Sequence, residues 1–299
     1  MTPKPSTFTT LGTSGGPLQN PRRAQPAHLL MAGNRPILVD CGDGAIGQLA
    51  RAGSDIRAVD EIFLTHHHFD HIGGLSAAIG VSMMMMRRNP LTVYGPPGIK
   101  AIVDGLIQAC KVPNEIGFGV AGQDMPQGSD FIVVREIVPG DRIELEGVTV
   151  TNCENTHYRP ESKAGTPGYL SLSYRFDLAD RSILFTGDTG ECKAVAALAK
   201  GVDLLVGEMM DAELTMGHIR RNNPNTPEGA LAKIAEHIKG HHLSAEQLGD
   251  LAAEAGAKHV VATHLPPGLA TPETAPQYIA RIQARFSGDV SISQDLASY

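Results

Sequence analysis

The sequence lacks the features that mark a membrane or secreted protein. No apolar run is long enough to cross a bilayer, and residues 1–6 contain no apolar signal core. The four cysteines form no C-x-x-C pair; they are Cys41, Cys110, Cys153 and Cys192. Buried free thiols in a reducing compartment are therefore expected. We predict a cytoplasmic protein without membrane contact, whereas removal of a leader would instead place it in the periplasm or outside the cell.

An excess of positive charge is also absent. The formal net charge is −7 at pH 7 and the sequence pI is about 5.9. Such an overall field does not gather polyanions, although a sum over the chain leaves room for a local basic patch. Nucleic acid is therefore not favoured as a partner.

Low-complexity linkers and repeats of 20–50 residues are absent as well. Of the 299 residues, 42% are hydrophobic and 19% are charged, which is typical of a globular chain with a sizeable core. Strand-like runs lead into helix-like runs in both the first and the last part of the chain, with no composition break between them. We predict a single α/β domain over residues 1–299.

Hydrophobic periodicity locates the main elements. Strands are expected at residues 8–12, 28–31, 36–40, 61–65, 91–94, 169–176, 181–189, 202–206 and 259–264, with β pattern through 131–152. Helices are expected at 45–52, 71–86, 99–110, 191–200, 227–239 and 244–255. Residues 113–129 show no clear period, which predicts a loop over one face. Within these elements His28 and the methionines at 83–86 are interpreted as core residues.

The chemistry centres on Thr65-His66-His67-His68-Phe69-Asp70-His71. Side chains alternate along extended backbone, so His66 and His68 point the same way and His67 points to the other side. Asp70 and His71 follow where the chain turns, and can face a second point nearby. This geometry suits two adjacent metal ions. A surface histidine cluster or a purification tag is the alternative, but a tag would lie at a terminus among polar residues.

Three further metal-binding side chains, His157, Asp188 and His264, each follow a strand-like run directly. Active sites of α/β sheets lie at the carboxyl ends of strands, where these three residues are expected. Imidazole and carboxylate groups are ordinary zinc ligands, and catalytic zinc keeps one position open for water. Asp40 or Asp43, at the end of another strand, is expected to brace the metal-binding loop.

The successive motifs resemble those of the metallo-β-lactamase fold, in its ribonuclease Z and arylsulfatase-like branch. The resemblance spans nearly the whole chain and rests on Asp40 to Gly44, the histidine stretch with Gly73-Gly74, Phe185 to Thr189, Asp203 to Glu208, His242 to Ser244 and Ala262 to His264. It implies a four-layered αβ/βα sandwich. It also implies a homodimer, because this branch often dimerises.

Carried over by position, the resemblance implies two zinc ions, with other divalent metals as an alternative. His66, His68 and His157 would bind one ion, Asp70, His71 and His264 the other, and Asp188 would bridge them. His242, oriented by Glu208, would lie near the scissile group, so that Asp70, His242 and Glu208 form the predicted catalytic set. Solvent-exposed loop positions are the alternative for His242 and Glu208.

Substrate binding is expected from Arg22, Arg23 and Tyr158. The two arginines follow the glycine-bearing loop 13–17, whose backbone N–H groups can face an anion, and a solvated loop is their alternative. The long basic arm by which ribonuclease Z grips transfer RNA is missing, because only Tyr158 to Gly168 intervenes before the next strand.

The predicted activity is zinc-dependent hydrolysis, by a metal-bridging hydroxide, of a small phosphodiester, sulfate ester or carboxylic ester. A lactonase or another C–O or C–N hydrolase on the same site is the first alternative. Processing of transfer RNA 3′ ends and a noncatalytic metal-binding protein are the others.

Overall fold

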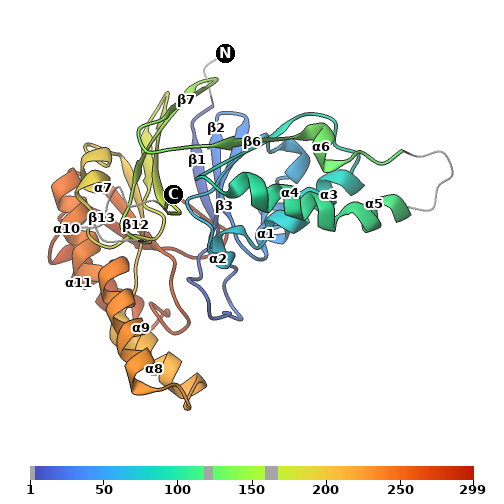
Figure 1. The fold of residues 1–299 in the computed structure, drawn as a ribbon. Helices are drawn as coiled ribbons and strands as arrows, with labels where there is room; N and C mark the ends of the chain where they lie inside the picture. The colour runs from blue at the N-terminus through green and yellow to red at the C-terminus, as the bar shows by residue number, and fades with distance from the viewer. Residues whose placement is uncertain (1–3, 118–123, 159–167) are drawn as a thin grey trace. The chain divides into compact units, whose positions relative to one another are not determined.

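A computed structural model describes residues 4–117, 124–158 and 168–299. The chain forms two compact units, each with one seven-stranded sheet (Figure 1). The first unit comprises residues 1–13, 21–137 and 294–299, and the second comprises 14–20 and 138–293. The predicted single domain over 1–299 stays a prediction. No helix in the described ranges is both long and apolar enough to cross a membrane.

The first sheet has the strand order β14-β1-β2-β3-β4-β5-β6. Its first three pairings are antiparallel and the next three, from β3 to β6, are parallel. The strands are β1 (Thr7–Gly12), β2 (Ala27–Ala32), β3 (Arg35–Cys41), β4 (Glu61–Phe63), β5 (Leu91–Gly95), β6 (Ile132–Glu136) and β14 (Ala297–Ser298). β3 and β4 are apolar and almost wholly buried, as expected for the centre of a sheet.

Helices of the first unit pack on this sheet and on one another. They are α1 (Ala45–Arg51), α2 (Phe69–Ile72), α3 (Leu75–Met84), α4 (Ile99–Ala109), α5 (Lys111–Ile116) and α6 (Gly128–Phe131), with a 3-10 turn at Ile56–Ala58. The short α2 separates β4 from α3, so the histidine stretch spans the passage from strand to helix.

The second sheet has the order β13-β12-β11-β10-β9-β8-β7. Its pairings are antiparallel from β7 to β10 and parallel from β10 to β13. The strands are β7 (Arg142–Leu145), β8 (Val148–Glu154), β9 (Leu172–Leu178), β10 (Ser182–Phe185), β11 (Leu204–Glu208), β12 (His259–Thr263) and β13 (Asp289–Ile292). The central β10 and β11 are wholly buried, so both faces of this sheet are covered at its middle.

The helices of the second unit are α7 (Lys193–Leu198), α8 (Ala212–Asn222), α9 (Glu228–His241), α10 (Ala245–Ala255) and α11 (Ala275–Gln283). α10 begins with a reciprocal capping box between Ser244 and Gln247 and ends at Gly256, whose positive φ of 64° suits a glycine. α8 and α9 form a hairpin that extends away from the rest of its unit (Figure 1). Its main apolar cluster is made by Met210, Met216, Leu231 and Ile238, and Leu214 of α8 packs against the core of the unit.

The predicted α/β class is confirmed, as are most strands, with shifted ends. The expected strand 61–65 ends at Phe63, and the helix expected over 71–86 divides into α2 and α3. The loop expected at 113–129 is wrong at both ends, where α5 and α6 form, and residues 118–123 lie outside the described ranges. α8, α11, β13 and β14 were not predicted.

Core packing was correctly predicted for His28, which is 4% exposed and lies 5.7 Å from the Phe8 ring, between ring centres. For the methionines at 83–86, the prediction of core packing is correct only in part. Met83 is buried, whereas Met84 and Met85 are 53% and 45% exposed. Met83 is the last buried residue of α3, which ends at Met84, so the following methionines lie beyond the core face.

Candidate active site

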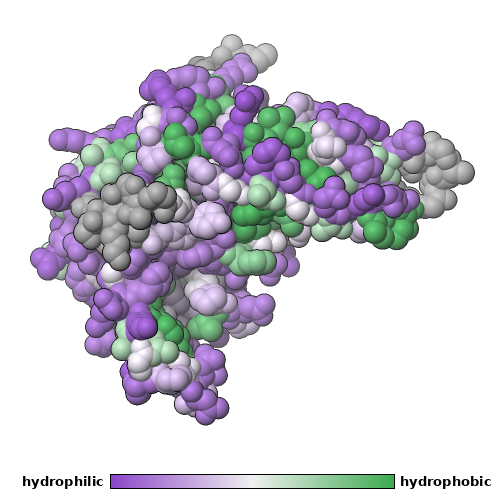
Figure 2. Space-filling view, viewed as in Figure 1, coloured by the Kyte–Doolittle hydropathy of each residue, from purple (hydrophilic) through white to green (hydrophobic). Residues whose placement is uncertain are grey.

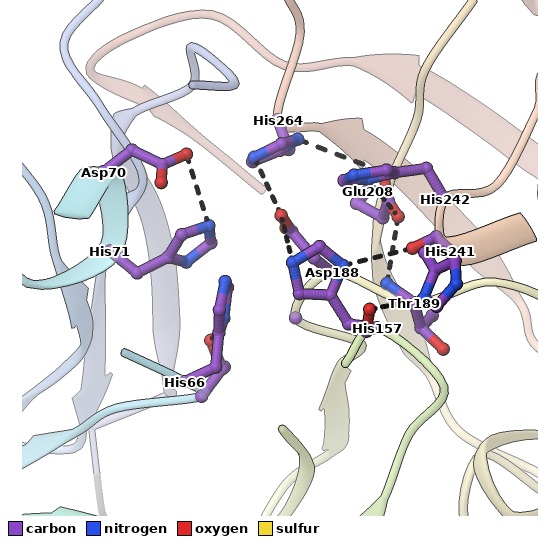
Figure 3. A network of polar contacts seen from close by, with 12 residues as sticks. His66, Asp70, His71, His157, Asp188, Thr189, Glu208, His241, His242 and His264 are labelled. Carbon is purple, nitrogen blue, oxygen red and sulfur yellow. Dashed lines mark hydrogen bonds and ion pairs between the residues drawn. The ribbon is translucent and has the colours of Figure 1, made fainter. Parts of the chain in front are cut away.

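In the first unit, the chain between β4 and α2 gathers three imidazoles. The His66 ring centre lies 4.8 Å from that of His68 and 4.0 Å from that of His71 (Figure 3). His67 turns away and donates a hydrogen bond to the Pro96 carbonyl, and burial lowers the pKa of its imidazole. The predicted alternation of this stretch is therefore confirmed, although its backbone is extended rather than paired in the sheet.

Asp40 holds this stretch in place. Its carboxylate accepts hydrogen bonds from the Thr65 backbone N–H at 2.8 Å and from the Thr65 hydroxyl at 3.0 Å. Asp40 Oδ2 also lies 2.8 Å from His71 Nδ1. Nδ1 of His71 thus faces a carboxylate, and its Nε2 lies 3.7 Å from Asp70 Oδ2. Asp40 is the bracing carboxylate, whereas Asp43 is exposed.

Close backbone packing positions Asp70. A Cβ on Gly42 would lie 2.1 Å from the carbonyl oxygen of Asp70, which is far inside any normal contact. Gly42 follows β3 directly, so a glycine there lets the first turn of α2 rest against the end of that strand. The motif Asp40-Cys41-Gly42 therefore supports the ligand-bearing segment in two ways, through the Asp40 carboxylate and through the missing side chain of Gly42.

In the second unit, His157, Asp188 and His264 follow β8, β10 and β12, and all three are at most 3% exposed. Asp188 Oδ2 lies 3.1 Å from His264 Nε2 and 3.7 Å from His157 Nε2 (Figure 3). The opposite nitrogen of His157, Nδ1, lies 3.2 Å from the carbonyl oxygen of His241. The three side chains that the sequence predicts at strand ends therefore converge.

The absence of a side chain at Gly15 leaves room for His264. A Cβ on Gly15 would lie 2.7 Å from His264 Nδ1 and from the His264 carbonyl oxygen. Any other residue would displace the imidazole or the backbone. The loop 13–17 thus contributes a close contact with a predicted metal ligand, which the sequence pattern alone did not reveal.

His242 and Glu208 form a buried pair, with 7% and 1% of each residue exposed. His242 Nδ1 lies 3.0 Å and 3.1 Å from the two carboxylate oxygens of Glu208. Glu208 also accepts a hydrogen bond from the Thr189 backbone N–H at 2.9 Å. The alternative of solvent-exposed loop positions is therefore wrong. One ligand-type atom each of Asp188, His242 and His264 lies within 4.8 Å of the others.

The donor set of both units suits a metal such as zinc. Two ligand atoms of a tetrahedral zinc, each about 2.0–2.1 Å from the metal, lie on the order of 3.3 Å apart. The imidazole–carboxylate distances of 3.1 Å and 3.7 Å bracket this value. His71 and His157 each direct Nδ1 to an oxygen acceptor, so that Nε2 faces the neighbouring carboxylate. The residues present thus fit a divalent metal.

The predicted substrate-binding residues have different surroundings. Arg23 Nη1 donates to the Thr13 hydroxyl at 2.6 Å, and burial lowers the pKa of its guanidinium. Arg23 therefore takes part in the internal structure of the first unit, while Arg22 is exposed. The Tyr158 ring centre lies 5.5 Å from that of His157. The segment expected between Tyr158 and Gly168 lies outside the described residues, apart from its ends.

Sequence reasoning missed His237 and gave no role to His241. Both are on α9, and their ring centres are stacked 4.5 Å apart. His237 also lies 5.9 Å from both His157 and His242, between ring centres. The two histidines are spaced i, i+4, which places them on one face of a helix. The predicted helix 227–239 ended before His241, whereas α9 extends to it.

Comparison with known proteins agrees with this geometry. The model of the β-lactamase superfamily domain matches residues 35–265, so the chain belongs to that superfamily and has its α/β sandwich fold, as predicted. Ribonuclease Z of Mycobacterium avium (strain 104) is 30% identical over 291 residues, which cover 96% of this chain and 95% of the relative. The expected ribonuclease Z branch is thereby confirmed.

Solved structures show the same fold. The short form of human tRNase Z has a TM-score of 0.68 at 19% identity, over 98% of each chain. Zinc-bound PqqB from Methylobacterium extorquens also has a TM-score of 0.68, at 15% identity, over 98% of this chain and 99% of that one. The protein is a hydrolase of the metallo-β-lactamase fold.

The expected partners are contradicted by these relatives. A small-molecule ester was expected and nucleic acid was not favoured, but the relatives are ribonucleases. The expectation rested on the net charge of −7, which is a sum over the chain. Phosphate contacts depend on local groups, so an acidic total does not exclude a nucleic-acid substrate.

Proposed function

We propose that this protein hydrolyses RNA phosphodiester bonds, as a processing enzyme of transfer RNA 3′ ends. The observation that carries the proposal is the buried set of imidazoles and carboxylates at strand ends, in a chain that aligns with ribonuclease Z over 96% of its length. This was an alternative in the sequence interpretation, and the relatives favour it over small esters.

We further propose two zinc ions as the cofactor. As the family resemblance implies, His66, His68 and His157 would hold one ion, and Asp70, His71 and His264 the other, with Asp188 shared. When bound, zinc would supply Lewis acidity at the phosphate and lower the pKa of bound water to about 7. The imidazole–carboxylate spacing in both units supports this assignment.

The protein's own groups would act around that chemistry. Asp40 orients His71 through Nδ1. Glu208 accepts a hydrogen bond from the Nδ1–H of His242, which favours the charged imidazolium and directs Nε2 away from the carboxylate. His242 would then donate a proton or hydrogen bond to the departing ribose oxygen. The proposed roles of His242 and Glu208 both depend on the hydrogen bond between them.

The surrounding chain supports a cytoplasmic location, which we retain as part of the proposal. All four cysteines are free thiols, and burial raises the pKa of Cys41 and of Cys153 to about 12. Such thiols are poorly reactive and behave as small apolar side chains.

The test is a cleavage assay on a transfer RNA precursor with a 3′ trailer. Zinc-loaded protein should release the trailer as one fragment, and a chelator should abolish the reaction until zinc is restored. Asp188→Asn should be inactive at equal protein concentration. A zinc-loaded, folded protein that leaves the precursor intact, while it hydrolyses lactones or aryl sulfates, would overturn the proposed substrate.

A further inference from the structure

One face of α9 carries a row of nitrogen-bearing side chains. Lys233, His237 and His241 are four residues apart, and this spacing places them in line on one side of a helix. Lys233 and His237 are exposed, and His241 is partly buried. Successive members are about 6 Å apart along the axis, from a rise of about 1.5 Å per residue. We call these three residues the α9 row.

The α9 row ends at the candidate active site. His241 Nδ1 hydrogen-bonds to the His157 carbonyl oxygen, and the His241 carbonyl oxygen faces His157 Nδ1 (Figure 3). One ring nitrogen each of His157, His237 and His242 lies within 4.8 Å of the others. His237 therefore stands at the solvent side of two buried histidines that have proposed roles in catalysis.

The hairpin that carries the row is firmly attached at its base. Asp211 caps α8 by accepting a hydrogen bond from the Leu214 N–H, and it also accepts from Tyr278 and Arg281 on α11. Hydrophilic residues gather at the far end of the hairpin (Figure 2), where Arg220 and Arg221 close α8. These contacts join the start of the hairpin to α11, within the same unit as His157.

We propose that the α9 row binds the RNA strand next to the scissile phosphate, with Lys233 on a backbone phosphate and His237 stacked on, or hydrogen-bonded to, the adjoining nucleotide. This inference rests on the proposed ribonuclease function. The α9 row would give the chain a local basic contact for RNA, although the net charge of the whole chain is negative.

The chemistry of the row favours a nucleotide strand over a further metal ion. An ammonium group forms strong contacts with phosphate oxygens and accounts for much of the affinity of proteins for nucleic acid. Unstacked bases in single-stranded RNA stack on aromatic rings, including histidine. A metal ion could bind His237 together with His157 and His242, but it would not contact Lys233. An RNA strand can contact every residue of the α9 row.

The experiment compares Lys233→Gln and His237→Ala with Lys239→Gln, measured on the zinc-loaded, full-length protein. Lys239 is an exposed lysine of the same helix, about 160° around the axis from His237 at 100° per residue. Each variant is assayed on a precursor transfer RNA and on bis(p-nitrophenyl) phosphate, a small phosphodiester that lacks the neighbouring nucleotides of an RNA strand. RNA affinity is measured by fluorescence anisotropy over a range of salt concentrations.

His237→Ala should weaken RNA binding roughly 5- to 150-fold, the range of one lost base stack. Lys233→Gln should raise KM for the precursor and reduce the slope of log K against log salt by about 0.7, as expected for one single-strand phosphate contact. Lys239→Gln should change neither quantity. All three variants should keep wild-type zinc content, and Lys239→Gln should keep the wild-type rate on the small phosphodiester. Lys233→Gln and His237→Ala should lose more activity on the precursor than on the small phosphodiester.

Two results would overturn the inference. One is equal RNA affinity and salt slope in Lys233→Gln, His237→Ala and Lys239→Gln, with the wild type cleaving RNA. The other is zinc loss in His237→Ala, which would make His237 a metal ligand. A wild-type protein that cleaves no RNA would instead refute the proposed function, so the two failures are distinguishable.

Discussion

The two sheets follow the same plan, yet their matching strands end in carboxylates with different tasks. In each sheet three antiparallel pairings are followed by three parallel ones, and the first parallel strand is β3 in one and β10 in the other. Asp40 lies near the end of β3 and braces the segment that follows β4, whereas β10 leads into Asp188. Asp40 contacts Thr65 and His71, whereas Asp188 contacts His157 and His264.

Topology decides where a carboxylate lies in the fold, and the neighbouring groups decide what that carboxylate does. A carboxylate next to a backbone N–H, a hydroxyl and one imidazole nitrogen is a positioning group. A carboxylate between two Nε2 atoms is placed as a metal ligand. The comparison yields predictions that separate the two roles.

The largest expected contrast is between Asp188→Asn and Asp40→Asn. Asp188→Asn should reduce RNA cleavage to background and lower the zinc content, because it removes a charged ligand. Asp40→Asn should cost about 10- to 100-fold in metal affinity or activity, the usual effect of a group that orients a ligand. Elemental analysis and cleavage rates check both, with circular dichroism to verify folding. Equal losses from both changes would remove the distinction.

The next contrast lies within the histidine stretch. His68→Ala should lose nearly all activity because it deletes a predicted ligand, whereas His67→Ala should retain most of it, since His67 contacts Pro96 instead. The measurement is kcat on precursor RNA together with zinc content. If His67→Ala lost metal as completely as His68→Ala, the assigned side-chain directions would be incorrect.

A smaller effect is expected from His242, the proposed proton donor. His242→Ala should keep full zinc content while kcat falls by roughly 10²- to 10⁴-fold, as is usual for a positioned acid. Glu208→Gln should cost less, because Glu208 acts through His242. The defect should shrink on nitrophenyl esters, whose leaving group needs no proton. Zinc loss in His242→Ala, or unchanged cleavage of RNA, would contradict the assignment.

The smallest effect concerns pH and the ion pair between Glu246 of α10 and Arg281 of α11. The hydrogen bond from Arg281 lowers the pKa of Glu246 to about 2, so the ionised pair stabilises the folded state at neutral pH. Because the pKa is lowered, this contribution is present above the unfolded value of about 4.5 and is lost as the pH falls towards 2. The wild type should exceed Glu246→Gln in melting temperature at pH 7, and the difference should vanish near pH 2.

Glu254→Gln, a change to an exposed residue of the same helix, serves as the control and should follow the wild type at both pH values. A constant gap between wild type and Glu246→Gln from pH 7 to pH 2 would show that the ion pair is not the cause.

Much of the site was predictable because its signals are local. The alternation of His66, His67 and His68 follows from extended backbone, and His157, Asp188 and His264 each follow an apolar run that forms a strand. The bracing role of Asp40 could be narrowed only to Asp40 or Asp43. The choice depends on the turn after β3, where Asp40 adopts a positive φ of 59°.

The parts that sequence did not predict depend on long-range packing. The approach of Gly15 to His264 joins residues far apart in the chain. α8 has a polar sequence that packs mainly against its partner α9, so its own periodicity gave little signal. The two sheets share the same order of antiparallel and parallel pairings, but this similarity lies in strand pairing and produces no repeat in the sequence.

The proposed cofactor of this protein is a pair of zinc ions. The most direct test is the metal content of carefully prepared protein, measured by elemental analysis, for the wild type and for Asp188→Asn. Seven ligands of which one is shared imply about two zinc ions per chain in the wild type, and fewer in the variant. One ion or none in fully folded, zinc-equilibrated wild-type protein would contradict the claim.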